Sequence, residues 1–139
     1  MLRAEVFYPS YSEVRYLETE GEMLYALELL ARANEAYFRA HPELPHPYRW
    51  GGLYRREGKK EQWLSAPYIL EAIRAGKPVD CEDWSALLAG WYRARRRERA
   101  KVVLLRQHPR RGGLSYHALV MLPGRRLKDP SKALGMKAV

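Results

Sequence analysis

Cysteine is almost absent from this chain of 139 residues, and long apolar runs are absent altogether. The single cysteine, Cys81, has no second cysteine with which to form an internal disulfide or a cysteine-rich metal site. The longest run of apolar or small residues, from Ala86 to Tyr92, is much too short to cross a bilayer. The stretch MLRAEVFYPSYSEV at the amino terminus lacks the apolar core of a signal peptide. We therefore expect a protein without a membrane partner, located in the cytoplasm where it is made.

Zinc-ligand spacings and the phosphate-binding P-loop pattern are also missing, so the sequence predicts no metal and no other cofactor. The composition is that of a globular protein, with 47% hydrophobic, 12% aromatic and 29% charged residues. A chain of this length buries roughly two-thirds of the surface that its unfolded form exposes. We expect one domain, residues 1–139, with no linker that divides it.

Positive charge, by contrast, is abundant and concentrated late in the chain, and the net charge is +9. Residues 1–47 carry eight acidic and four basic side chains, whereas residues 93–111 carry one acidic and nine basic ones. The candidate anion-binding segment comprises Arg93, Arg95, Arg96, Arg97 and Arg99. One interpretation is a nucleic-acid footprint. The favoured alternative is a solvated helix end whose arginines complement the helix dipole or the acidic first third of the chain.

A helix is predicted between Thr19 and Pro42, within an N-terminal helical part formed by residues 1–47. Thr19 and Glu22 match a capping box, and Pro42 cannot continue the helix. The inward-facing residues recur at helical spacing: Met23, Leu27, Leu30, Asn34 and Tyr37.

Two shorter helices are predicted downstream. One has Ser65 as its N-cap and Gly76 as its C-terminal stop. The other follows Asp80, has Cys81 in its first turn, and ends within the sequence RARRRER.

Two β-rich segments follow the helices, at residues 101–107 and 115–122, with the turn sequence HPRRGG between them. A last short strand follows the Pro-Gly pair at 123–124 and reaches Asp129. Because the helices come first and the antiparallel strands second, the sequence predicts an α+β fold.

Cys81 occupies a position at which a cysteine can react. In the first turn of a helix its sulfur meets unpaired backbone N–H groups and the positive end of the helix dipole, which favour thiolate. Three neighbouring carboxylates oppose this, unless Asp80 caps the helix and both Glu82 and Asp83 face solvent or bind arginines. The alternative is a small buried thiol that only packs.

His117 is the histidine best placed to be held rigidly, because it lies inside a predicted strand while the other three lie beside proline. Asp129 follows on the next predicted strand. A two-residue turn at Pro123 and Gly124 would place the two side chains on opposite faces of the sheet. A three-residue connection that also includes Leu122 would set them opposite each other on one face.

If the two side chains share a face, a Cys-His-Asp triad follows. Cys81 attacks an amide carbonyl, His117 passes the proton to the leaving amine, and Asp129 fixes the imidazole tautomer. The oxyanion needs donors as well. The backbone N–H of Cys81 is one candidate, and Gln62 or Trp63 is the candidate for the other or for a wall of the site.

Three motifs occur in this order along the chain: VDCEDWSALLAGWYRA, YHALVMLPG and DPSKALGM. Together they resemble the Cys, His, Asp core of the transglutaminase-like proteins in the papain-like cysteine peptidase superfamily, particularly the small type found among bacteriophage genes. The resemblance covers residues 48–136. Val79 stands where the pattern usually has glycine, and RARRRERAKVV replaces a shorter, less charged link. Neither departure removes a member of the triad.

The resemblance implies that the cysteine helix packs on a small antiparallel sheet carrying the other two residues. It implies Cys81 as nucleophile, His117 as base and Asp129 as orienting acid, in hydrolysis or acyl transfer at peptide or isopeptide amide bonds. The expected partners are a protein or peptide substrate and phage virion proteins, with the virion as a second location. Two alternatives stay open: a catalytically silent phage structural or assembly protein that keeps the fold, and a nucleic-acid-binding module that uses the basic segment.

Overall fold

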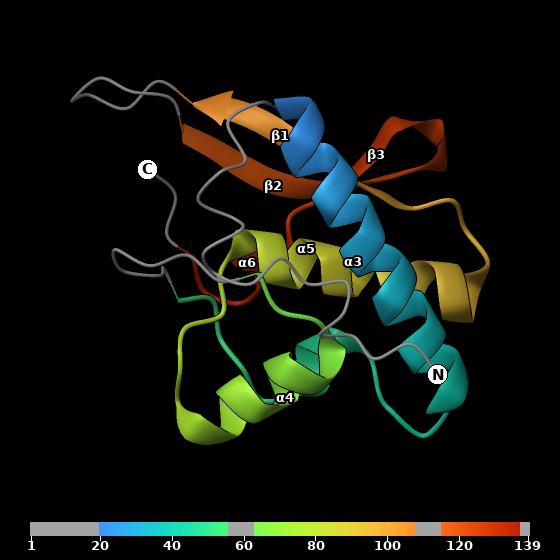
Figure 1. Cartoon of the computed structure of the whole chain (residues 1–139), viewed down its shortest axis with the longest axis vertical. Helices are drawn as coiled ribbons and strands as arrows, with labels where there is room; N and C mark the ends of the chain where they lie inside the picture. Colours follow the sequence, from blue (N-terminus) through green and yellow to red (C-terminus); the bar gives the residue numbers. More distant parts are fainter. Residues whose placement is uncertain (1–19, 56–62, 108–114, 137–139) are drawn as a thin grey trace.

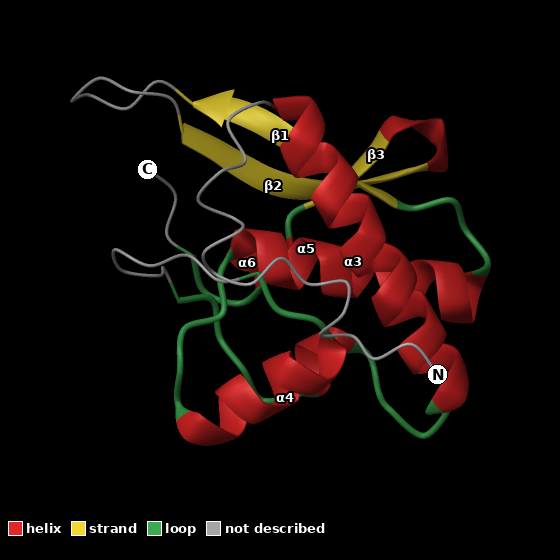
Figure 2. Cartoon of the chain, viewed as in Figure 1, coloured by secondary structure: helices red, strands yellow, loops and turns green. Residues whose placement is uncertain are grey.

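The computed structural model describes residues 20–55, 63–107 and 115–136, which form a mixed α+β fold (Figure 1). Helices come first along the chain and a three-stranded antiparallel sheet comes second, which confirms the predicted fold class. The sheet lies at the top of Figure 2 and the helices lie below it and across its front.

The helix that carries the cysteine is the central element. Helix α5 (Cys81–Trp91) packs on strand β2 of the sheet on one side and on helix α3 (Glu20–Ala40) on another. Helix α3 runs diagonally across the front of the molecule in Figure 1, and helix α4 (Ala66–Ala75) lies at the bottom of the view, away from the sheet.

Helix α3 confirms the first predicted helix. Its sequence is rich in Ala, Leu and Glu, which have high helix propensity. Leu27, Leu30 and Phe38 on its apolar stripe are completely buried, so burial of this face stabilises the helix in the fold. The capping box predicted at Thr19 lies outside the described residues.

Helix α4 begins and ends where the sequence predicts, but a residue other than Ser65 accepts the hydrogen bond from the first backbone N–H of the helix. Gly76 ends the helix with a φ of +68°, a conformation that glycine adopts without strain. Ser65 is the N-cap residue, yet its buried hydroxyl makes no hydrogen bond among the described residues. Instead, Asn34 Oδ1 on α3 accepts a hydrogen bond from Ala66 N at 2.8 Å. The cap position was therefore predicted correctly and its chemistry wrongly.

The sheet has the order β1-β2-β3, formed by β1 (Lys101–Gln107), β2 (Ser115–Leu122) and β3 (Arg126–Lys128). The bounds of the first two strands coincide with the prediction. A short helix, α6 (Pro130–Ala133), follows the sheet and was not predicted. Asp129 is its N-cap and proline occupies its first position, a combination that favours a helix start.

The core consists of two clusters of buried side chains, and α5 contributes to both. One cluster joins α5 to α3 and the sheet, and includes Cys81. The other joins α5 to α4 and α6, around the fully buried Trp84. Helices α3 and α5 lie close together at Gly90, where a Cβ would lie only 2.6 Å from Asn34 Cβ and 2.8 Å from Glu35 N. The crossing therefore requires a residue without a side chain.

Candidate active site

Two carboxylates hold the start of α5 by accepting hydrogen bonds from the backbone. Asp80 is the N-cap, and its Oδ1 accepts from Cys81 N at 2.6 Å. Asp83 completes a capping box, since its Oδ2 accepts from Asp80 N at 3.0 Å. The other oxygen of Asp83 accepts from Leu64 N at 2.7 Å and ties the segment before α4 to the cysteine helix. Both carboxylates therefore position Cys81.

Glu82 and Asp83 are both buried. The sequence predicts an activated cysteine only if Asp80 caps the helix and these two carboxylates face solvent or bind arginines. Glu82 is 6% exposed and Asp83 is completely buried. Backbone donors meet the charge of Asp83, but Glu82 accepts a hydrogen bond from the Cys81 thiol. Asp80 caps the helix as that condition required, and the solvent-facing alternative for Glu82 and Asp83 does not hold.

The environment of Cys81 favours the thiol. Burial raises the pKa of Cys81, and the negative charges of Glu82 and Asp80 raise it further. The backbone of Ala118 on β2 acts in the opposite direction, because its N–H donates a hydrogen bond to the sulfur. Together these effects raise the pKa of Cys81 well above the ordinary thiol value, so the resting protein carries a neutral, buried thiol.

His117 and Asp129 form the pair that the triad hypothesis requires. His117 Nε2 donates to Asp129 Oδ2 over 2.8 Å, with side-chain exposures of 8% and 19%. The second oxygen of Asp129 accepts from Lys132 N at 3.2 Å, so the same carboxylate caps α6. Asp129 is thus anchored independently of the histidine, and the Nδ1 atom of His117 is left as the nitrogen that can exchange a proton.

The connection between β2 and β3 explains why the pair forms. It has three residues, as the shared face requires, but it consists of Pro123–Arg125 and lies one residue later than predicted. Gly124 and Arg125 both have positive φ, +76° and +58°, which closes the tight turn. Continuing the observed register brings Asp129 level with Leu119. Leu119 and His117 share a face because side chains alternate along a strand, so the pairing is diagonal rather than direct.

Ala118 joins the cysteine helix to the histidine strand through its backbone. Its N–H donates to the sulfur of Cys81, and its carbonyl oxygen accepts from Ser85 Oγ at 3.1 Å. Ser85 lies one turn after Cys81 on the same side of α5. The sulfur therefore contacts the residue that directly follows His117. Sequence reasoning missed Ser85, although its spacing of four residues from Cys81 was a usable signal.

Trp63 is buried in the same core cluster as Cys81 and is only 2% exposed. It therefore packs in the core to which Cys81 also belongs. Gln62, the other candidate oxyanion donor, lies outside the described residues.

The first arginines of the basic segment bind other parts of this chain. Arg93 forms a two-pronged ion pair with Glu28 on α3, with N–O distances of 2.9 and 2.6 Å, and donates from Nε to Ala100 O. Arg95 donates to the carbonyl oxygens of Phe38 and His41, at 2.7 and 2.9 Å. These carbonyls lie at and just beyond the C-terminal end of α3, where a helix lacks internal partners.

The remaining arginines of that segment are directed outward. Arg96 is the last residue of the π-helical turn η2 (Tyr92–Arg96), and its guanidinium carbon lies 5.5 Å from the ring centre of Trp91. Arg97 and Arg99 follow this turn. Arg97 and Arg99 are exposed, and their side chains form no hydrogen bond or ion pair within the described part of the chain. The segment therefore divides into two arginines that hold the fold and three at the surface.

One group of metal-ligand atoms occurs among the described residues, within 4.8 Å of one another: those of Asp80, Cys81 and Glu82. Asp80 caps the helix and the Cys81 thiol donates to Glu82. We assign the group to the helix start. No helix in residues 20–55, 63–107 or 115–136 has the length and apolarity needed to span a membrane.

Comparison of the chain with protein-family models, with curated proteins and with solved structures found no match in any of the three.

Proposed function

We propose that this protein is a cysteine-dependent hydrolase or acyl transferase of the transglutaminase-like type, acting on peptide or isopeptide amide bonds. The observation that carries the proposal is the 2.8 Å bond from His117 to Asp129, on the strand whose next residue contacts the Cys81 sulfur. His117 and Asp129 pair as a base with its orienting acid, and Cys81 lies on the helix that packs against the histidine strand. Sites of this type combine a nucleophile, a base and an orienting acid.

The proposed reaction uses each side chain at a stated atom. Asp129 accepts the Nε2 proton of His117 in a hydrogen bond, which leaves Nδ1 to take the proton from Cys81. The thiolate attacks the amide carbonyl, a C–S bond forms, the C–N bond breaks, and the imidazolium returns the proton to the leaving amine. Water or a second amine then cleaves the thioester, giving hydrolysis or transfer.

The burial of Cys81 sets a condition on this mechanism. Because the pKa of Cys81 is raised, the thiolate–imidazolium pair is the minor form of the resting protein. Substrate binding must therefore displace the thiol from Glu82 toward His117. From the resemblance alone, we further propose a phage origin, a location in the host cytoplasm or the virion, and virion proteins among the partners.

The test is the rate at which iodoacetamide alkylates Cys81 across about pH 5 to 10, followed by intact mass. The wild-type rate near neutral pH is expected to be low but dependent on histidine, with a loss of about tenfold or more in His117→Gln. Asp129→Asn keeps a capping side chain and removes the charge, so a smaller loss is expected. His41→Gln and Glu98→Gln, which change a histidine and a carboxylate outside the site, should match the wild type.

A second candidate function is supported by a specific observation. Cys81 is 6% exposed and its thiol lies near the carboxylates of Glu82 and Asp80, as expected of a catalytically silent structural or assembly protein. Identical pH profiles for the wild type and His117→Gln, with a rate that rises only at alkaline pH, would overturn the proposed triad and favour this second function.

A further inference from the structure

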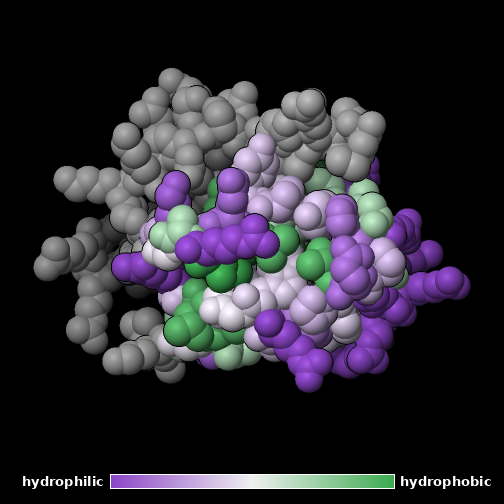
Figure 3. Space-filling view, turned by 90° about the horizontal axis from the view of Figure 1, so that it is seen from below, coloured by the Kyte–Doolittle hydropathy of each residue, from purple (hydrophilic) through white to green (hydrophobic). Residues whose placement is uncertain are grey.

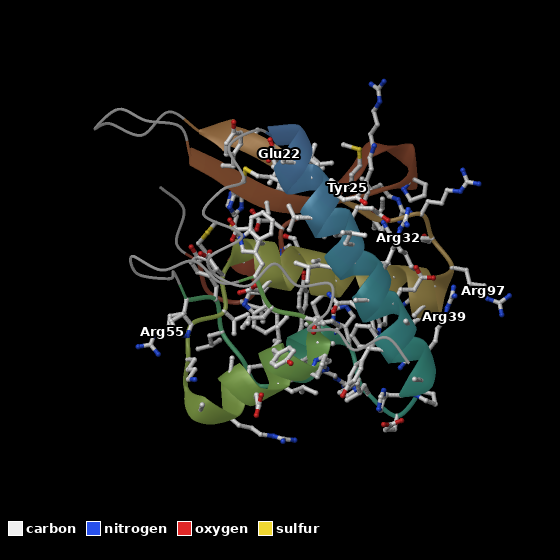
Figure 4. All side chains as sticks on the ribbon, in the orientation of Figure 1. Glu22, Tyr25, Arg32, Arg39, Arg55 and Arg97 are labelled. Atoms are coloured by element: carbon white, nitrogen blue, oxygen red, sulfur yellow. The ribbon has the colours of Figure 1, made fainter. Side chains whose placement is uncertain are left out.

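A groove of about 890 Å³ lies at the opposite end of α5 from Cys81. Its walls come from α3 and from the segment that runs from η2 into β1. Arg39 and Arg97 both line it, and Figure 4 shows them at the same edge of the molecule. Seen from below, strongly hydrophilic residues gather on that side (Figure 3). The volume is within the usual range for a ligand site.

The acidic side chains of the groove are all neutralised by arginines of the same chain. Glu28 binds Arg93. Glu35 binds Arg39 within α3. Glu98 binds an arginine of β3, Arg126, at 2.9 Å. No carboxylate of the groove is therefore left to balance its other cations.

Three cations of the groove remain without an acidic partner in the described part of the chain: Arg97, Arg99 and Lys101. All three are exposed. Arg97 has a φ of +52° and ends the π-helical turn at the groove. The three positive charges occupy five consecutive residues and can approach one bound segment together.

We propose that this groove binds an acidic polypeptide segment of a partner protein. Arginine forks match carboxylates in two-pronged hydrogen bonds, so free guanidinium groups beside an open groove favour such a ligand. A nucleic-acid backbone fits less well, because it would place a phosphate at every nucleotide along the groove, whereas the unpaired cations among the described lining residues lie only at residues 97–101. A peptide can instead place its carboxylates at Arg97 and Arg99 and its amide groups elsewhere along the groove.

The groove and the proposed active site are separate. From Cys81 to Arg93 the chain advances about 18 Å along α5 and its extension. Binding at the groove therefore neither requires nor reports the chemistry of the thiol, and the proposal goes beyond the proposed function.

Fluorescence anisotropy tests the proposal with a labelled eight-residue peptide that contains four glutamates and with the same peptide carrying glutamine instead. The full chain should bind the glutamate peptide at least about tenfold more tightly. The triple variant Arg97→Gln, Arg99→Gln, Lys101→Gln should lose about tenfold or more in affinity. Cys81→Ser should bind as the wild type does, which separates this result from any failure of the triad.

The matched control removes the same charge from elsewhere, as Arg74→Gln, Lys77→Gln, Lys128→Gln, and should change the affinity less than about twofold. Equal losses in the two triple variants would show a general effect of net charge and overturn the proposal. Tighter binding of a labelled single-stranded oligonucleotide, lost in the groove variant, would overturn it in favour of a nucleic-acid surface. If the groove variant unfolds, equal affinity of the wild type for the two peptides is the result that refutes the proposal.

Discussion

The hydroxyl of Ser85 is the side-chain contact that fastens the cysteine helix to the histidine strand. It donates to the buried carbonyl oxygen of Ala118 on β2 at 3.1 Å. Without this donor, the carbonyl of Ala118 would be buried and short of a partner. The backbone N–H of Ala118 also donates to the Cys81 sulfur, so the position of Ser85 affects the geometry of the candidate site.

Ser85→Ala should lower the free energy of unfolding by about 1 to 3 kcal/mol, because it leaves a buried acceptor unsatisfied. Ser65→Ala is the matched control: Ser65 is equally buried, but its hydroxyl makes no hydrogen bond among the described residues, so its loss should be close to neutral. Urea unfolding followed by circular dichroism measures both. Equal destabilisation by the two substitutions would contradict the assigned role of Ser85.

At the scale of elements, the arrangement depends on how closely α5 can approach α3. Both helices end near the same place, and arginines that follow α5 bind Glu28 and the last carbonyls of α3. The two helices are also in tight contact at Gly90. Helix α5 is therefore fixed against α3 at Gly90 and at its C-terminal end. These contacts position Cys81, at the N-terminal end of the same helix, relative to the sheet.

Gly90→Ala should destabilise the fold by about 1 to 3 kcal/mol, since the new methyl group would overlap Asn34 and the backbone of Glu35. Gly21→Ala is the control, because nothing lies within 4 Å of a Cβ at that position of α3. Alanine has the higher helix propensity there, so a gain of up to about 1 kcal/mol is expected. Thermal unfolding compares them; a stabilising Gly90→Ala would refute the close crossing.

For the molecule as a whole, the acidic N-terminal part of the chain and the basic segment after α5 form an ion pair with each other. The acidic α3 and the basic segment that follows α5 face each other, with Glu28 between Arg32 and Arg93. Burial alone would raise the pKa of Glu28, but hydrogen bonds and charges from these two arginines outweigh it and lower the pKa below its ordinary value of 4.5. The remaining positive charge faces outward at the groove.

This pKa shift predicts a pH window for stability. A carboxyl with a lowered folded-state pKa contributes stability that is present above 4.5 and is lost as pH falls through the folded value. Glu28→Gln should therefore have a lower melting temperature than the wild type at about pH 6, and the difference should shrink toward about pH 3. The effect should stay below about 1 kcal/mol, because the pair is partly exposed.

Glu43→Gln is the control for that window, since Glu43 is exposed and forms no ion pair among the described residues. Its melting temperature should follow the wild type at every pH. A Glu28→Gln difference that persists unchanged at acid pH would mean that packing, and not charge, accounts for it.

The local patterns of this sequence predict its elements well. Periodicity located α3, α4 and α5, and β-rich runs located β1 and β2 to the residue, because these signals act over a few neighbouring positions. Helix α6 was missed, although Asp129 and Pro130 carried an N-terminal signal, because four residues are too few for periodicity to appear. The turn after β2 was placed one residue too early, since only pairing with β3 sets its register.

By itself, the sequence determined the order of helices and strands, the α+β class, and the placing of Cys81 at a helix start with His117 on a strand. Tertiary structure alone decided that His117 and Asp129 meet, that Glu82 is buried against the thiol, and that Arg93 and Arg95 hold α3 while Arg97 and Arg99 do not. The physical reason is the range of the interactions. Propensity and capping depend on residues within one turn, whereas burial, register and ion pairing depend on which distant segments the core brings together.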